Sequence, residues 1–121
     1  MARILMNHHV LAVPDKKASA KFFMDILGFK KLFEDEGWIV VIKDACQVML
    51  GECPDAIAPG KLGDHNYFGY FLVDNASEYF EEVKAKGVTF TSTLADKPWK
   101  MREFGIQTPD GFRIMIGQQI R

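Results

Sequence analysis

A unit of strand, capping residue, helix and terminal glycine occurs twice in this chain, and it constrains the fold more than any other feature of the sequence. In the first copy, HHVLAVPDKKASAKFFMDILGF, Asp15 stands where a side chain can cap the first turn of a helix, and Gly28 stands where the helix ends. In the second copy, FGYFLVDNASEYFEEVKAKGV, Asp74 and Gly87 have the same roles at the same spacing. The repeat predicts two related halves, each beginning with a strand and a helix.

Apolar residues in both copies recur at helical spacing, which predicts amphipathic helices over residues 16–27 and 76–86. Short apolar or β-branched runs between turn residues predict strands. These strands cover residues 4–13, 29–34, 38–43, 46–51, 67–73, 88–93, 101–108 and 112–118, and residues 94–98 are predicted to form a loop. The order βαβββ–βαβββ predicts an α+β fold of two βαβββ modules. Two helices cannot cover both faces of so many strands, so one face must curve, pair with another sheet or enclose something.

The length of 121 residues predicts a single domain that contains both halves. The first half is expected to cover about residues 3–52 and the second about residues 66–119. Residues 53–65 contain Pro and Gly without periodicity and are predicted to link the two.

The composition excludes several classes of function. A formal net charge of -1 gives no reason to expect nucleic acid as a partner. No signal peptide and no apolar run of membrane-spanning length is visible, so no membrane partner is expected and the chain is predicted to be cytoplasmic. The spacing of Cys46 and Cys53 fits no zinc motif, which favours structural thiols.

Four stretches of the sequence, in this order, resemble the vicinal oxygen chelate superfamily of glyoxalases, bleomycin-resistance proteins and extradiol dioxygenases. They are HHVLAVPD, FFMDILGFK, VDNASEYFEEVKAKGV and KPWKMREFGIQTPDGFRIMIGQ, and they extend over nearly the whole chain. The resemblance implies an α+β fold in which two βαβββ modules form a curved mixed sheet that curls into a cup, often shared between two subunits. It also implies four positions at which members of the superfamily can hold a metal ion.

Those four positions fall on His8, Met49, Phe68 and Met115 in this sequence. Only His8 is a ligand of the expected type, because a thioether is a weak ligand for hard or borderline divalent ions and a phenyl ring is none. A catalytic divalent site needs about three protein ligands. We therefore predict that the chain holds no metal and no other cofactor.

The same positions become candidates for an apolar ligand pocket if the cup is open. The other reading is a filled cup, in which methionine fills gaps in a core. Strand alternation places Tyr70 beside Phe68 and Gln47 beside Met49. The predicted ligand-binding residues are His8, Trp38, Gln47, Met49, Phe68, Tyr70, Trp99, Arg102 and Met115. Glu103 is the one candidate for a catalytic acid or base, and a lone Glu is weak support for catalysis.

Three functions remain open from the sequence. The first is a metal-free homodimer that sequesters a hydrophobic or aromatic small molecule, in the manner of bleomycin-resistance proteins. The near-neutral charge disfavours bleomycin itself, because a cationic drug favours an acidic cup. The second is a metal-dependent, glyoxalase-like lyase or isomerase, or a relative of the dioxygenases. The third is a non-catalytic scaffold with a filled cup.

Overall fold

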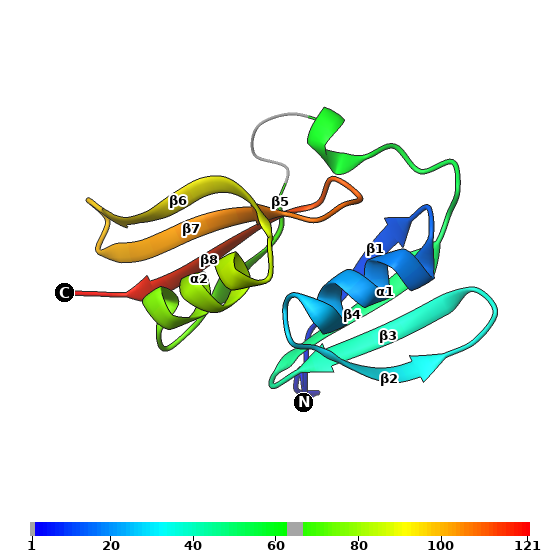
Figure 1. Cartoon of the computed structure of the whole chain (residues 1–121). Coiled ribbons are helices and arrows are strands. Elements are labelled where there is room, and N and C mark those ends of the chain that lie inside the picture. Colours follow the sequence, from blue (N-terminus) through cyan, green and yellow to red (C-terminus); the bar gives the residue numbers. More distant parts are fainter. Residues whose placement is uncertain (1, 63–66) are drawn as a thin grey trace. The chain divides into compact units, whose positions relative to one another are not determined.

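Each half of the chain folds into four strands and one helix in the order βαβββ, in a computed structural model that describes residues 2–62 and 67–121 (Figure 1). The first half contains β1 (His8–Val13), α1 (Lys16–Asp25), β2 (Lys30–Glu34), β3 (Trp38–Lys43) and β4 (Cys46–Glu52). A short 3-10 helix, η1 (Pro59–Lys61), precedes the second half. The second half contains β5 (Tyr67–Leu72), α2 (Ala76–Ala85), β6 (Thr89–Lys97), β7 (Met101–Gln107) and β8 (Arg113–Gln119).

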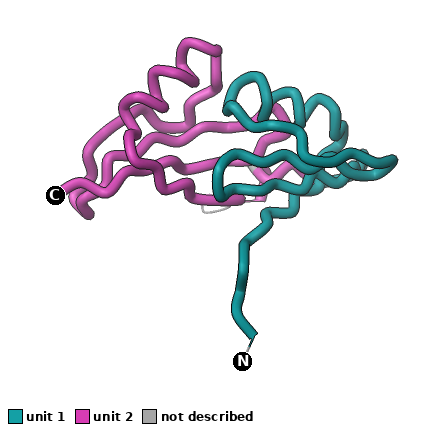
Figure 2. Tube along the Cα trace, turned by 90° about the horizontal axis from the view of Figure 1, so that it is seen from below, with its two compact units in different colours: residues 1–56 teal, residues 57–121 magenta. Residues whose placement is uncertain are grey.

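Each half forms its own four-stranded mixed sheet, with strand orders β1-β4-β3-β2 and β5-β8-β7-β6. The first strand of each half pairs in parallel with the fourth, and the other neighbours are antiparallel. The chain divides into two compact units, Met1–Ala56 and Ile57–Arg121, and each contains one sheet (Figure 2). The predicted α+β class and the predicted order of elements are confirmed. Residues 63–66, which include the end of the predicted linker, lie outside the described residues.

The core of each unit lies between its sheet and its helix. Alternate strand residues face the helix and are buried, as the period of two in a strand requires. In the first unit they include Leu11, Val13, Ile39, Val41, Val48 and Leu50, and in the second Phe104, Ile106, Ile114 and Ile116. Phe80 of α2 packs edge-on against Phe104, with ring centroids 5.3 Å apart. Because the single helix covers one face, the opposite face of each sheet is left for other roles.

Both helices have an N-terminal capping residue, but the one predicted for α2 is wrong. Asp15 caps α1 as predicted, since its Oδ1 accepts hydrogen bonds from the backbone N–H groups of Lys17 and Ala18 at 3.0 and 3.1 Å. Asp74 does not cap α2. The capping residue is Asn75, whose Oδ1 accepts from the backbone N–H of Glu78 at 3.0 Å. The cap directly precedes the first helical residue, and Asp74 stands one position too early.

The predicted strands differ from the structure at two places. Strand β1 begins at His8 rather than residue 4. In the register of the His8–Gln47 pair, residues 4–6 would face residues 43–45, which precede the first residue of β4, Cys46. The predicted loop over residues 94–98 is wrong. Strand β6 continues to Lys97, which pairs with Met101 across a tight turn. Among the helices in the part of the chain that the structure describes, none is long and apolar enough to cross a membrane.

Candidate functional site

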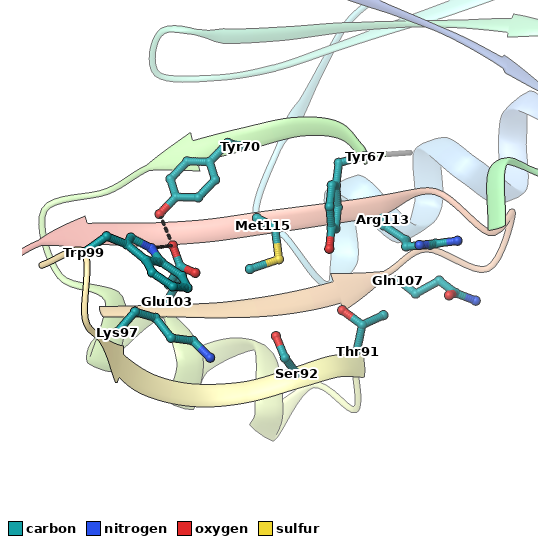
Figure 3. A pocket seen from close by; sticks show the side chains of 10 residues that line it. All are labelled: Tyr67, Tyr70, Thr91, Ser92, Lys97, Trp99, Glu103, Gln107, Arg113 and Met115. Carbon is teal, nitrogen blue, oxygen red and sulfur yellow. Dashed lines mark hydrogen bonds between the residues drawn. The ribbon is translucent and has the colours of Figure 1, made fainter. Parts of the chain in front are cut away.

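A pocket of about 910 Å³ lies on the face of the second sheet that α2 leaves uncovered (Figure 3). Its lining comes from β5, β6, β7, β8 and the turn between β6 and β7. The lining residues are Tyr67, Tyr70, Thr91, Ser92, Lys97, Trp99, Glu103, Gln107, Arg113 and Met115. All of them belong to one unit, so the pocket is built within residues 57–121.

Two glycines leave room for the side chains that line this pocket. Gly105 and Gly117 pair with Met115 and Glu103 across neighbouring strands. A Cβ atom at Gly117 would lie 1.9 Å from the Tyr70 hydroxyl oxygen, and one at Gly105 would lie 2.9 Å from the Met115 sulfur. The side chains that line the pocket therefore rest directly on glycine backbone, and a larger residue at either position would displace them.

A β-bulge in β5 decides which aromatic residues enter the pocket. The register against β8 shifts between Tyr67 and Gly69, so Tyr67 and Tyr70 both line the pocket. Phe68 is not among the lining residues. Its ring packs against Phe71 and Phe112, with centroids 5.7 and 6.1 Å away. The expectation that Phe68 and Tyr70 share a strand face is therefore wrong, because the extra residue of a bulge inverts the alternation.

Glu103 forms the polar centre of the pocket. Tyr70 donates its hydroxyl hydrogen to Glu103 Oε2 at 2.6 Å, and the indole N–H of Trp99 donates to the same oxygen at 3.3 Å. The residue is only 6% exposed. Within the described chain, no Lys, Arg or His nitrogen lies within 4.0 Å of its carboxylate. A buried acidic group is thus held by two neutral donors, one from β5 and one from the turn between β6 and β7, and both contribute aromatic surface to the pocket.

Tyr70 acts as a donor in this cluster over a wide range of pH. Its pKa is raised well above the ordinary value, first because its hydroxyl is removed from water and then because it bonds to Glu103. The residue as a whole is 46% exposed, so the loss of water concerns the hydroxyl end, which lies over Gly117. The phenol therefore stays protonated and keeps donating to the carboxylate.

Positive charge is present at both ends of the pocket. The Lys97 ammonium lies 6.0 Å from the centroid of the Trp99 ring, at a distance typical of a cation–π contact. Arg113 and Gln107 lie at the end away from Glu103, with Met115 between (Figure 3). Arg102 does not line the pocket. It makes two hydrogen bonds to Asp96, of 2.7 and 3.2 Å, as expected for a neighbour of Glu103 whose side chain faces the other way.

The other predicted binding residues belong to the first unit. Gln47 Nε2 lies 3.4 Å from His8 Nδ1 on the neighbouring strand. Trp38 lies over Gly51, where an added Cβ would be 2.9 Å from its ring. Met49 pairs with Val10 on β1. None of the four lines the pocket of the second unit, and their role in ligand binding stays a prediction.

Sequence reasoning missed several lining residues. They are Tyr67, Thr91, Ser92, Lys97, Gln107 and Arg113. Strand alternation from Glu103 and Met115 would have found Gln107 and Arg113, which pair directly across β7 and β8. Lys97 was missed because its segment was predicted to be a loop.

The four positions at which the superfamily can hold a metal do not fit one in this chain. Phe68 is packed among aromatic rings, and Met49 and Met115 offer only thioethers. Within residues 2–62 and 67–121, no three His, Cys, Asp or Glu side chains gather so as to hold an ion. Burial raises the pKa of the Cys46 thiol to about 11, which disfavours the thiolate that a metal requires.

Comparison with known proteins places the chain in a family. It is 26% identical over 131 residues to the bleomycin resistance protein of Geobacillus stearothermophilus, a match that covers 98% of this chain and 99% of that protein. The crystal structure of TioX from Micromonospora sp. ML1 has the same fold, with a TM-score of 0.78 and 19% identity over 95% of this chain and 98% of TioX.

The bleomycin-binding protein from bleomycin-producing Streptomyces verticillus, solved in complex with copper(II)-bleomycin, also shares the fold. Its TM-score is 0.73, with 21% identity over 100% of this chain and 99% of that one. A family model described as Glyoxalase/Bleomycin resistance protein/Dioxygenase superfamily matches residues 5–116. This match covers almost the whole chain and confirms the resemblance of the four sequence stretches, so the protein belongs to the glyoxalase/bleomycin resistance protein/dioxygenase superfamily.

Proposed function

We propose that this protein is a metal-free binding protein that sequesters a hydrophobic or aromatic small molecule in the pocket of its second sheet. The observation that carries the proposal is the combination of aromatic walls with one buried polar centre. Tyr67, Tyr70 and Trp99 provide flat apolar surface, and Glu103 provides a fixed hydrogen-bonding group. Ligand pockets typically combine mostly apolar walls with a few positioned polar groups.

The relatives support binding rather than catalysis. The Geobacillus relative is a bleomycin resistance protein, and the Streptomyces protein of the same fold binds bleomycin. A glyoxalase-like lyase would instead need a metal site, and His8, Met49, Phe68 and Met115 do not offer one. Elemental analysis of the purified protein should find less than stoichiometric divalent metal. One Zn, Ni, Fe or Mn per chain, lost in His8→Ala, would favour the lyase.

Binding should be visible as quenching of Trp99 fluorescence. In a Trp38→Phe background Trp99 is the sole tryptophan of the chain, so its fluorescence reports directly on a planar aromatic ligand in the pocket. We would titrate bleomycin and the dye 8-anilinonaphthalene-1-sulfonate, and follow the melting temperature in parallel, since a ligand that binds only the folded state stabilises it. Thr91→Phe is the matched control, because it places a ring in the pocket from an exposed strand position.

The outcomes separate two readings of the pocket. Quenching and stabilisation that disappear in Thr91→Phe support ligand binding at this site. If neither probe quenches Trp99 or raises the melting temperature, the pocket does not accept aromatic ligands and the scaffold reading is favoured.

We further propose that the protein is a homodimer. On the face of the first sheet that α1 leaves uncovered, Val10, Phe33 and Trp38 are 61%, 51% and 37% exposed. A second copy that covers this face would remove apolar surface from water. Sedimentation equilibrium should give twice the chain mass of 13.7 kDa. Val10→Lys should shift the protein to monomer, and a wild-type monomer at micromolar concentration would contradict the proposal.

A further inference from the structure

Only one of the two carboxylate oxygens of Glu103 accepts hydrogen bonds from the described residues. A carboxylate has two oxygens with about four acceptor sites between them. Tyr70 and Trp99 both donate to Oε2, which uses the acceptor sites of that oxygen. Oε1 accepts no hydrogen bond from the residues that the structure describes. The asymmetry leaves one oxygen with its full capacity to accept.

That second oxygen opens into the pocket. Among the described residues, no buried side-chain oxygen or nitrogen lacks a hydrogen-bond partner. Since Oε1 has no partner, it is not among the fully buried atoms and must be accessible from the pocket. Glu103 as a whole is nevertheless only 6% exposed. Glu103 lines the pocket, and its second oxygen points between Trp99 and Met115 (Figure 3). The pocket therefore contains a nearly desolvated acceptor that is held in one orientation.

The chemistry of this acceptor selects the ligand. A desolvated carboxylate favours a ligand that carries an N–H donor, because hydrogen bonds to charged groups are stronger than those between neutral groups. It rejects another acceptor, which would leave two facing lone pairs out of water. Trp99 and Tyr70, which hold the other oxygen, place flat rings beside the carboxylate, so the donor is best carried on a planar group. At the other end, Arg113 and Gln107 suit an acceptor.

We propose that the ligand of this pocket is a planar aromatic molecule that presents an amino N–H donor to Glu103 Oε1. This inference rests on the proposed binding function and narrows its ligand class. One N–H of the amino group donates to Oε1, whose acceptor sites are open. Uncharged amines suffice, since Lys97 beside Trp99 opposes additional positive charge at this end.

The test compares three probes of the same size: 3-aminoquinoline, 3-methylquinoline and quinoline-3-carboxylate. The first two are uncharged at pH 7.5 and differ in the donor. Binding is followed by NMR through the indole N–H signal of Trp99, which is bonded to Glu103. The aminoquinoline should bind about tenfold more tightly than the methylquinoline, as one good hydrogen bond provides, and the carboxylate should bind least.

Glu103→Gln provides the matched variant. Its amide oxygen must turn to Tyr70 and Trp99, which are donors, so its NH₂ group replaces Oε1 in the pocket. The preference for the aminoquinoline should fall to about one, while the affinity for the methylquinoline stays within about twofold. Gln107→Met, a change of similar size at the far end, should keep the tenfold preference. The wild-type ratio tests the inference by itself if Glu103→Gln does not fold.

The failures are distinguishable. If the amino and methyl probes bind the wild type equally, or the carboxylate binds best, the pocket binds ligands but Glu103 does not select them, and the inference is overturned. If none of the three moves the Trp99 signal at millimolar concentration, the binding function falls with it.

Discussion

Replacing Gly117 with alanine should disconnect Tyr70 from Glu103. The added Cβ would lie 1.9 Å from the Tyr70 hydroxyl oxygen and 2.6 Å from the ring carbon that bears it, so the ring must swing away. Tyr70 is partly exposed and has room to do so. Glu103 then retains only the longer bond from Trp99. The substitution thus removes one charge-assisted hydrogen bond without changing either partner.

The expected cost follows from two opposing terms. The lost hydrogen bond to a charged group is worth about 2 kcal/mol. Alanine in a strand loses less conformational freedom on folding than glycine, which returns about 0.5 kcal/mol. Gly117→Ala should therefore lower the free energy of unfolding by about 1.5 kcal/mol. In a Tyr70→Ala background there is no ring to collide with, and the same substitution should stabilise the protein by about 0.5 kcal/mol.

The measurement is a double-mutant cycle of urea unfolding, followed by Trp99 fluorescence in the Trp38→Phe background. The coupling between Gly117 and Tyr70 should be about 2 kcal/mol, within the range for residues in contact. If Gly117→Ala costs the same with and without the Tyr70 ring, the collision is not what destabilises it and the reasoning is refuted. A loss of the aminoquinoline preference in Gly117→Ala is not required, because Glu103 Oε1 remains open.

Three further predictions test the fold around the pocket. Phe68→Asp should cost about 3 kcal/mol in a urea titration, because it puts a charge among aromatic rings; a loss of about 1 kcal/mol or less would show that the ring is not core. Asn75→Ala should cost about 1 kcal/mol by loss of the α2 cap, and its control Asp74→Ala close to nothing; the reverse order would return the cap to Asp74. Because the pKa of Tyr70 is raised above about 10, the folded state keeps a proton that the unfolded chain loses above that pH, so stability should fall as pH rises. Tyr70→Phe lacks this dependence, so the difference in free energy of unfolding between the wild type and Tyr70→Phe should shrink as the pH rises above about 10. If the two curves of stability against pH stay parallel there, the pKa of Tyr70 is not raised.

The sequence by itself determined the order of elements and the fold class. Helix and strand periods are local properties, and the helix-ending glycines Gly28 and Gly87 have the positive φ values of 84° and 80° that favour this residue. The cap at Asp15 is also local, since it bonds to residues two and three positions later. The prediction that Asp74 caps α2 was wrong by one residue. Asp and Asn cap equally well, so only the position of the first helical residue decides between Asp74 and Asn75.

Tertiary structure alone decided the composition of the pocket. Tyr70, Trp99, Glu103 and Met115 were each recognised in the sequence, but nothing local shows that two donors meet on one oxygen of Glu103. Phe68 was assigned to the pocket from the family resemblance, and strict alternation placed Tyr70 on its face, but a bulge against β8 turned Phe68 towards Phe71 and Phe112. Alternation is a rule within one strand, whereas register and bulges are set by the strand that pairs with it. The pocket depends on those pairings, and so it could be read only from the folded sheet.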